Sequence, residues 1–123
     1  MAGKIVADTL ETGAGADIAT SYVVNGSAKA WINFDGTGTI AARDSFSVSS
    51  ISDTGTGETL ITFSNAFSNA DYVLNYTNGW GAATDFTQVA PTTTTGRIQA
   101  YETHTTNNTD RTYNLVAVHG DLA

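Results

Sequence analysis

Apolar and polar residues alternate along short stretches of the chain, and glycine- or asparagine-rich turns separate these stretches. Residues 28–34 are the clearest example, because every second residue is apolar and would lie on one face of a strand. Within residues 71–77, Tyr72, Leu74 and Tyr76 follow the same rule. No window places apolar residues at the 3.6-residue spacing of an amphipathic helix. The pattern therefore predicts β-strands throughout.

The strand-like stretches cover residues 4–10, 22–24, 28–34, 39–43, 46–51, 59–63, 71–77, 86–89, 97–105 and 113–119. Because the shortest of these ten pieces are too brief to count as full strands, we expect about eight or nine strands. Segments 46–51 and 59–63 should form a hairpin around the glycine-rich turn 53–58, and segments 97–105 and 113–119 should form the last strand pair. Short strands at this spacing predict an all-β fold, a single antiparallel β-sandwich that is jelly-roll-like. We expect the sandwich to span residues 26–123 and to follow an N-terminal arm of residues 1–25.

The last predicted strand is apolar on both faces, with Leu115 and Ala117 on one side and Val116 and Val118 on the other. Such a strand is either central in the sandwich, and covered on both faces, or it presents one face to a partner chain. Trp31 likewise lies opposite the apolar face of its own strand, which suits a core or a subunit interface. Trp31, Val116 and Val118 are therefore the candidate oligomer-interface residues.

Composition removes several classes of function. The 123 residues include no cysteine, which excludes disulfides and thiol chemistry. A formal charge of −7, with only five scattered cations, argues against nucleic-acid binding. The apolar runs are far too short to span a bilayer, so we expect no membrane insertion.

Catalytic and metal-binding chemistry has little support in the sequence. The two histidines, His104 and His119, are fifteen positions apart, and no Gly-x-Ser-x-Gly elbow accompanies them. Asp53 and Glu58 flank a glycine-rich loop that would suit calcium, but a simple hairpin turn explains these residues better. We therefore expect a protein that is not an enzyme and has no metal site and no cofactor.

A loop centred on Trp80 is the candidate binding site. Tyr76 and Asn78 precede Trp80 and Asp85 follows it, so aromatic, amide and carboxylate groups are close in sequence. An aromatic face beside such polar groups is the usual chemistry of sugar recognition. These four residues are therefore the candidate contacts for a host glycan or receptor. The alternative is that Trp80 folds back and caps an open end of the sandwich.

One long motif links the chain to a known family. Residues 27–38 read SAKAWINFDGTG, and they are followed by RDSFSVSSISDTGTGE at residues 43–58 and by further matches at residues 62–63 and 69–72. This text resembles the β-rich terminal domain of tail-fibre and related structural proteins of tailed bacteriophages, particularly phages of marine bacteria and cyanobacteria. The similarity covers roughly residues 26–76.

The resemblance implies a virion structural protein, made in the bacterial host cytoplasm and carried on the tail or the capsid exterior. It implies a homotrimer that attaches the virion to the host surface, and it carries no catalytic residue. In the family a long shaft usually precedes this domain, so the chain is either a short separate fibre, tip or decoration subunit, which we favour, or a fragment of a longer fibre. We expect its arm to bind other virion proteins. The alternatives are a capsid decoration, head-fibre or connector subunit without receptor contact and, less favoured, a glycan-cleaving depolymerase.

Overall fold

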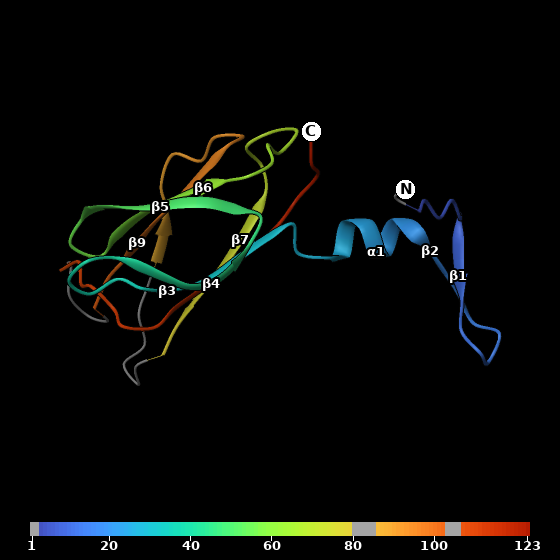
Figure 1. Cartoon of the computed structure of the whole chain (residues 1–123), viewed down its shortest axis with the longest axis horizontal. Coiled ribbons are helices and arrows are strands. Elements are labelled where there is room, and N and C mark those ends of the chain that lie inside the picture. The colour runs from blue at the N-terminus through green and yellow to red at the C-terminus, as the bar shows by residue number, and fades with distance from the viewer. Residues whose placement is uncertain (1–2, 80–85, 103–106) are drawn as a thin grey trace.

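The computed structural model describes residues 3–79, 86–102 and 107–123, and two four-stranded antiparallel sheets form its body (Figure 1). The first sheet has the order β4-β3-β10-β7 and the second has the order β5-β6-β9-β8. The strands of the first sheet are β3 (Ala30–Asp35), β4 (Ala41–Phe46), β7 (Val73–Asn78) and β10 (Asn114–His119). Those of the second sheet are β5 (Val48–Gly55), β6 (Glu58–Phe63), β8 (Phe86–Gln88) and β9 (Thr95–Ala100). The predicted all-β sandwich is confirmed.

The core lies between the sheets and comes directly from the alternating pattern. Along β3, β6, β9 and β10 every second side chain is buried. The largest fully buried side chains come from both sheets: Phe34, Ile61, Ile98 and Val118. Alternation places these residues on the inner faces, because successive strand side chains point to opposite sides of a sheet.

Ser47 forms the corner at which the chain leaves the first sheet and enters the second. It adopts the left-handed backbone region, with φ of 56°, and separates β4 from β5. Its carbonyl accepts a hydrogen bond from the Ser64 N–H (2.9 Å). The predicted strand 46–51 is therefore wrong at its start, because alternation continues across a corner that changes the sheet.

The predicted pairing of the last two strands is also wrong. β9 pairs with β6 and β8 in the second sheet, whereas β10 lies between β3 and β7 in the first. An isolated bridge joins Tyr101 to Asn108, which lies in the loop before β10 and not in that strand. The intervening loop crosses from one sheet to the other, and residue periodicity carries no information about such a crossing.

The N-terminal arm extends away from the body (Figure 1). A ribbon of β1 (Thr9–Glu11) and β2 (Asp17–Ala19) leads into the helix α1 (Thr20–Gly26), which contains no buried residue. The strand expected at residues 22–24 is thus helical, and the strand expected at residues 4–10 begins only at Thr9. Three apolar residues in a row do not distinguish a strand from a short helix. No helix within the described ranges is long and apolar enough to cross a bilayer.

Candidate functional site

The loops joining the strands at the end of the sandwich farthest from the arm form the distal end (Figure 1). Two of the four predicted binding residues, Tyr76 and Asn78, lie here because both belong to the last part of β7. The other two, Trp80 and Asp85, lie outside the described residues. The structure therefore places half of the predicted site at the distal end.

Tyr76 points toward the core rather than away from it. It has the same strand parity as buried Leu74, and its half-buried ring packs against the hydrophobic core. Its hydroxyl donates a hydrogen bond to Asn114 Oδ1 (2.7 Å). Burial raises the pKa of Tyr76, while a hydrogen bond with the Asn78 side chain and the charge of Arg111 act in the opposite direction. These contacts make Tyr76 a structural link within the distal end.

Asn114 is the buried polar residue that organises this link, and the sequence analysis did not identify it. Its Nδ2 donates to the Arg111 carbonyl (2.6 Å) and to the Phe34 carbonyl (3.3 Å). Asn114 is 3% exposed, so each of these bonds replaces contact with water. Its spacing in the sequence could have identified it, because Asn114 lies two and four positions before Val116 and Val118 and therefore shares their inward face of the strand.

A second polar network ties the β5–β6 hairpin to β9. Glu58 forms an ion pair with Arg97 and accepts hydrogen bonds from Gln99 Nε2 (2.7 Å) and Asn108 Nδ2 (3.4 Å). At the other side of the turn, Asp53 Oδ1 accepts a hydrogen bond from the Gly55 N–H (2.9 Å). The hairpin interpretation of this segment is confirmed, and its two carboxylates have protein partners.

The described residues contain no group of three or more His, Asp or Glu side chains that could hold a metal ion. His119 is the last residue of β10 and pairs with Val73, at the end of the sandwich near the arm. His104 lies outside the described residues.

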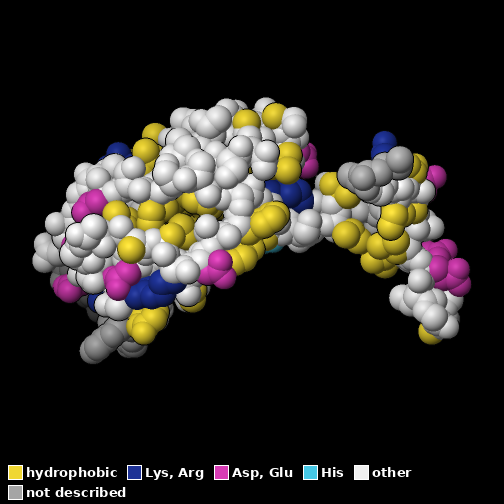
Figure 2. All heavy atoms as spheres, viewed as in Figure 1, with side chains coloured by type: hydrophobic (Ala, Val, Ile, Leu, Met, Phe, Trp, Pro, Cys, Tyr) yellow, Lys and Arg dark blue, Asp and Glu magenta, His cyan; other side chains and the backbone are white. Residues whose placement is uncertain are grey.

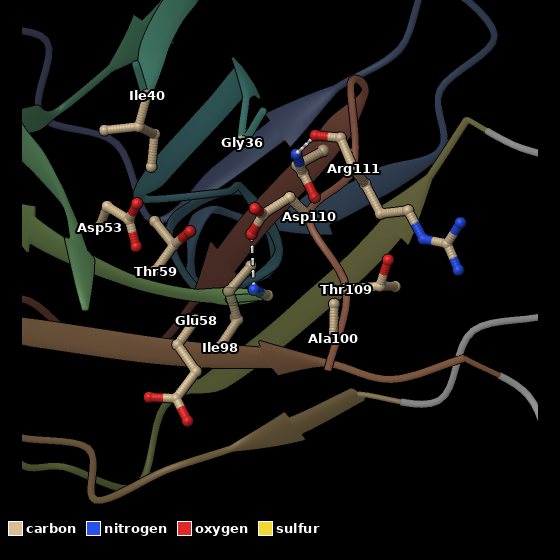
Figure 3. A pocket seen from close by; sticks show the side chains of 12 residues that line it. Gly36, Ile40, Asp53, Glu58, Thr59, Ile98, Ala100, Thr109, Asp110 and Arg111 are labelled. Carbon is tan, nitrogen blue, oxygen red and sulfur yellow. Dashed lines mark hydrogen bonds between the residues drawn. The ribbon is translucent and has the colours of Figure 1, made fainter. Parts of the chain in front are cut away.

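A small cavity separates the hairpin from the loop that precedes β10 (Figure 3). Its volume of about 10 Å³ is close to the room that one water molecule needs. The Gly57 N–H donates to Asp110 Oδ1 (2.6 Å) across it, and the Ala100 N–H donates to the Gly57 carbonyl (2.9 Å). A sugar ring cannot enter such a space, so these polar groups join loops and do not line a ligand pocket.

Two of the three residues predicted for the oligomer interface do not lie on the outer face of the first sheet. Val116 and Val118 are 4% and 1% exposed and belong to the core between the sheets. Their strand is central, and it is the opposite face, with Leu115 and Ala117, that points away from the core. Two valines inside the core cannot form a subunit interface, so the prediction chose the wrong face of β10. Trp31, by contrast, is 38% exposed.

The strand register places Trp31 and Leu115 in one groove on that outer face. Trp31 pairs with Phe46 and Ala117, and Leu115 pairs with Asn33 and Thr77. We call this surface the outer groove. Its outward-facing residues are Trp31, Asn33, Asp44, Asn75, Thr77, Leu115 and Ala117. Asn33 Oδ1 is buried there without a hydrogen-bond partner among the described residues. The outer groove thus combines three apolar side chains, Trp31, Leu115 and Ala117, with polar groups that a partner could satisfy.

Comparison of the chain with protein-family models, with curated proteins and with solved structures finds no match.

Proposed function

We propose that this protein is a non-enzymatic structural protein of a bacteriophage virion, of the tail-fibre or tail-tip type, which assembles as a homotrimer and contributes to attachment to the host. The family resemblance of residues 26–76 supports this assignment. In the structure this segment runs from just before β3 into β7 and supplies strands to both sheets. The resemblance therefore covers β3, β4, β5, β6 and part of β7, but not β8, β9 or β10.

The observation that carries the proposal is the combination of a closed sandwich with a projecting arm whose apolar residues are exposed. Ile5 and Val6 are 91% and 81% exposed. Figure 2 shows the arm as a separate lobe on a narrow neck, with hydrophobic side chains gathered on it. Exposed contiguous apolar surface marks an interaction site in a soluble protein. Such an architecture suits a subunit that assembles with other copies of itself or with other virion proteins.

The distal end favours a second candidate function. Its loops are joined by Glu58, Asp110 and Asn114, and its cavity admits no more than about one water molecule. Among the described residues, loops joined in this way around so small a cavity suit a capsid decoration, head-fibre or connector subunit that touches no receptor. Under the first proposal, host contact falls to the loop containing Trp80.

Immunogold electron microscopy of the virions that carry this protein distinguishes the two candidates. Label at the tail tip or fibres supports the attachment role, and label confined to the capsid or connector supports the second candidate. Virions without label, from a lysate that contains the protein, would contradict both.

The glycan contact has its own test. If Trp80 stacks on a host sugar, Trp80→Ala should abolish binding of the purified protein to host cells while leaving its circular dichroism spectrum and its unfolding midpoint unchanged. Phe86→Ala, a second aromatic truncation close in sequence, is the control for general effects of losing a ring. Unchanged binding by Trp80→Ala would remove Trp80 from the proposed site.

A further inference from the structure

The molecule exposes more surface than a compact protein of its size. Its accessible surface is 7455 Å² for 12.8 kDa, whereas a compact monomer of that mass exposes about 6,300 Å². The excess of about 1,200 Å² exceeds the roughly 800 Å² that each partner buries in a standard protein interface. The chain thus has enough surplus surface to form one stable interface.

Part of this surplus lies on the arm, which has an apolar groove of its own. We call it the arm groove. Its lining residues are Lys4, Ile5, Val6, Ala7, Leu10, Thr20, Val23 and Val24. A seven-residue helix and a ribbon of two three-residue strands are too short to be stable alone in water. The arm therefore needs a surface on which to pack.

The junction between arm and body holds the arm away from its own sandwich. Ser27 is extended, its N–H donates to the Val23 carbonyl (3.2 Å), and its Oγ donates to the Val24 carbonyl (3.4 Å). Lys29 Nζ binds the same Val24 carbonyl, while the Lys29 N–H donates to the Val118 carbonyl (2.8 Å) in the body. These bonds link the end of α1 to the start of β3. A return of the arm onto its own outer groove would break them.

The outer groove and the arm groove are complementary in chemistry. The arm groove is lined mainly by apolar side chains, whereas the outer groove combines the apolar Trp31, Leu115 and Ala117 with polar neighbours. Each groove has a single charged residue along its lining: Asp44 in the outer groove and Lys4 in the arm groove. A contact between the grooves would bury the exposed faces of Trp31 and Leu115 against Val6 and its neighbours. It would also bring one cation to one anion, which favours a single orientation.

We propose that the arm of one copy packs into the outer groove of a second copy of this chain. Because the two surfaces differ, the contact is heterologous, and repetition around a symmetry axis closes it into a ring in which every arm and every groove is used. This inference rests on the self-association within the proposed function and is independent of where the protein sits in a virion.

We call the packing of one copy's arm on another copy's outer groove the exchange. Cross-linking of the full chain tests it directly, because the chain has no cysteine of its own. Lys4→Cys and Asp44→Cys are made in separate chains that carry different affinity tags, then mixed, unfolded and refolded together, and treated with a short bis-maleimide. We expect a covalent product that carries both tags. A double variant with both cysteines, treated at high dilution, should give little cross-linked monomer.

Each result has one meaning. Cross-linked monomer from the double variant, without the two-tag product, would show that the arm folds back on its own body and would overturn the exchange. An oligomer by light scattering without the two-tag product would overturn the exchange but leave self-association standing. A monomer at micromolar concentration would contradict both.

Two matched leucines provide an independent test by sedimentation equilibrium. Leu115, in the outer groove, and Leu122, near the C-terminus and outside both grooves, are each 43% exposed. Leu115→Asn should weaken self-association by roughly tenfold or more, because it places an amide in the apolar contact. Leu122→Asn should leave it within about twofold. Equal effects of the two substitutions would contradict the assignment of the groove.

Discussion

Gly57 is the position at which the structure predicts the sharpest response to a single methyl group. A Cβ built there would lie 2.6 Å from Thr109 N, 2.7 Å from the Ala100 carbonyl oxygen and 2.9 Å from the Thr109 carbonyl oxygen. All three are backbone atoms, so no flexible side chain can move aside. Gly57 also has a φ of +69°, which favours glycine. Gly57→Ala should therefore separate the hairpin from the loop that precedes β10.

Gly38 provides the matched control, because it has a similar φ of +61° but open space around its Cβ position. Gly38→Ala should cost only the backbone strain, about 1 kcal/mol of unfolding free energy. Gly57→Ala adds steric overlap worth about 2 kcal/mol, for a total of about 3 kcal/mol. The difference between the two variants isolates the contact between the hairpin and the loop.

Urea unfolding followed by circular dichroism measures both substitutions. With an m-value of roughly 1.5 kcal/mol/M, the unfolding midpoint should fall by about 2 M for Gly57→Ala and by about 0.7 M for Gly38→Ala. The m-values should match that of the wild type. A Gly57→Ala variant no less stable than Gly38→Ala would refute the close approach of the two backbones.

Three further substitutions test the distal end. The Thr37 hydroxyl and N–H, together with Arg43, hold the pKa of Asp35 below its usual value near 3.8, so this carboxylate contributes stability that is lost as the pH falls through its folded pKa. Asp35→Asn should then flatten the decline of unfolding free energy below about pH 4 in urea titrations, and parallel acid limbs would argue against it. Burial raises the pKa of Tyr76 above 10, so its contribution is complete below pH 10 and lost as the pH rises further; Tyr76→Phe should make the alkaline decline shallower, and an unchanged decline would contradict this. Asn114→Leu leaves the Tyr76 hydroxyl without its acceptor and should lower the unfolding free energy by about 2–3 kcal/mol, whereas a neutral result would show that the hydrogen bonds contribute little.

The alternating pattern predicts the inner faces of the sandwich well, and the reason is physical. Ala30, Ile32 and Phe34 are buried on one side of β3, and Tyr72 and Leu74 are buried in and beside β7, as their spacing indicates. One face of each strand must leave water, and a strand has a fixed period of two. Sequence alone therefore locates these positions without knowledge of the strand partners.

The same pattern cannot choose a face when both faces are apolar. On β10, Val116 is buried and Leu115 is 43% exposed, although leucine is the larger and more hydrophobic side chain. Asn114 lies on the inner side, where its side chain hydrogen-bonds to the Phe34 and Arg111 carbonyls. Only the folded chain brings Phe34 and Arg111 together with Asn114, so these contacts could not guide the choice of face from the sequence.

The functional prediction was limited by the same range of interaction. Tyr76 and Asn78 are close in sequence and were proposed together, whereas Asn114, which accepts the hydrogen bond of the Tyr76 hydroxyl, is 38 residues from Tyr76 along the chain. Glu58 and Arg97 are 39 residues apart. Side chains that belong to a local motif can be recognised in a sequence. Hydrogen-bond networks that join strands far apart along the chain can be predicted only if the order of the strands in each sheet is known. The sequence prediction paired β9 with β10, whereas they belong to different sheets, so it lacked the strand order that these networks require.

The distal end differs from the arm and the outer groove in how many of its polar side chains are hydrogen-bonded within the protein, and this difference bears on assembly. At the distal end, Glu58, Asp110 and Asn114 have protein partners, so a new contact there would have to compete with bonds already made. The arm groove is mainly apolar, and the outer groove contributes the apolar Trp31, Leu115 and Ala117. Burying these side chains removes contact with water without breaking such bonds. The proposed contact between the arm and the outer groove would therefore use surface that makes few such bonds, and it would leave the distal loops facing outward.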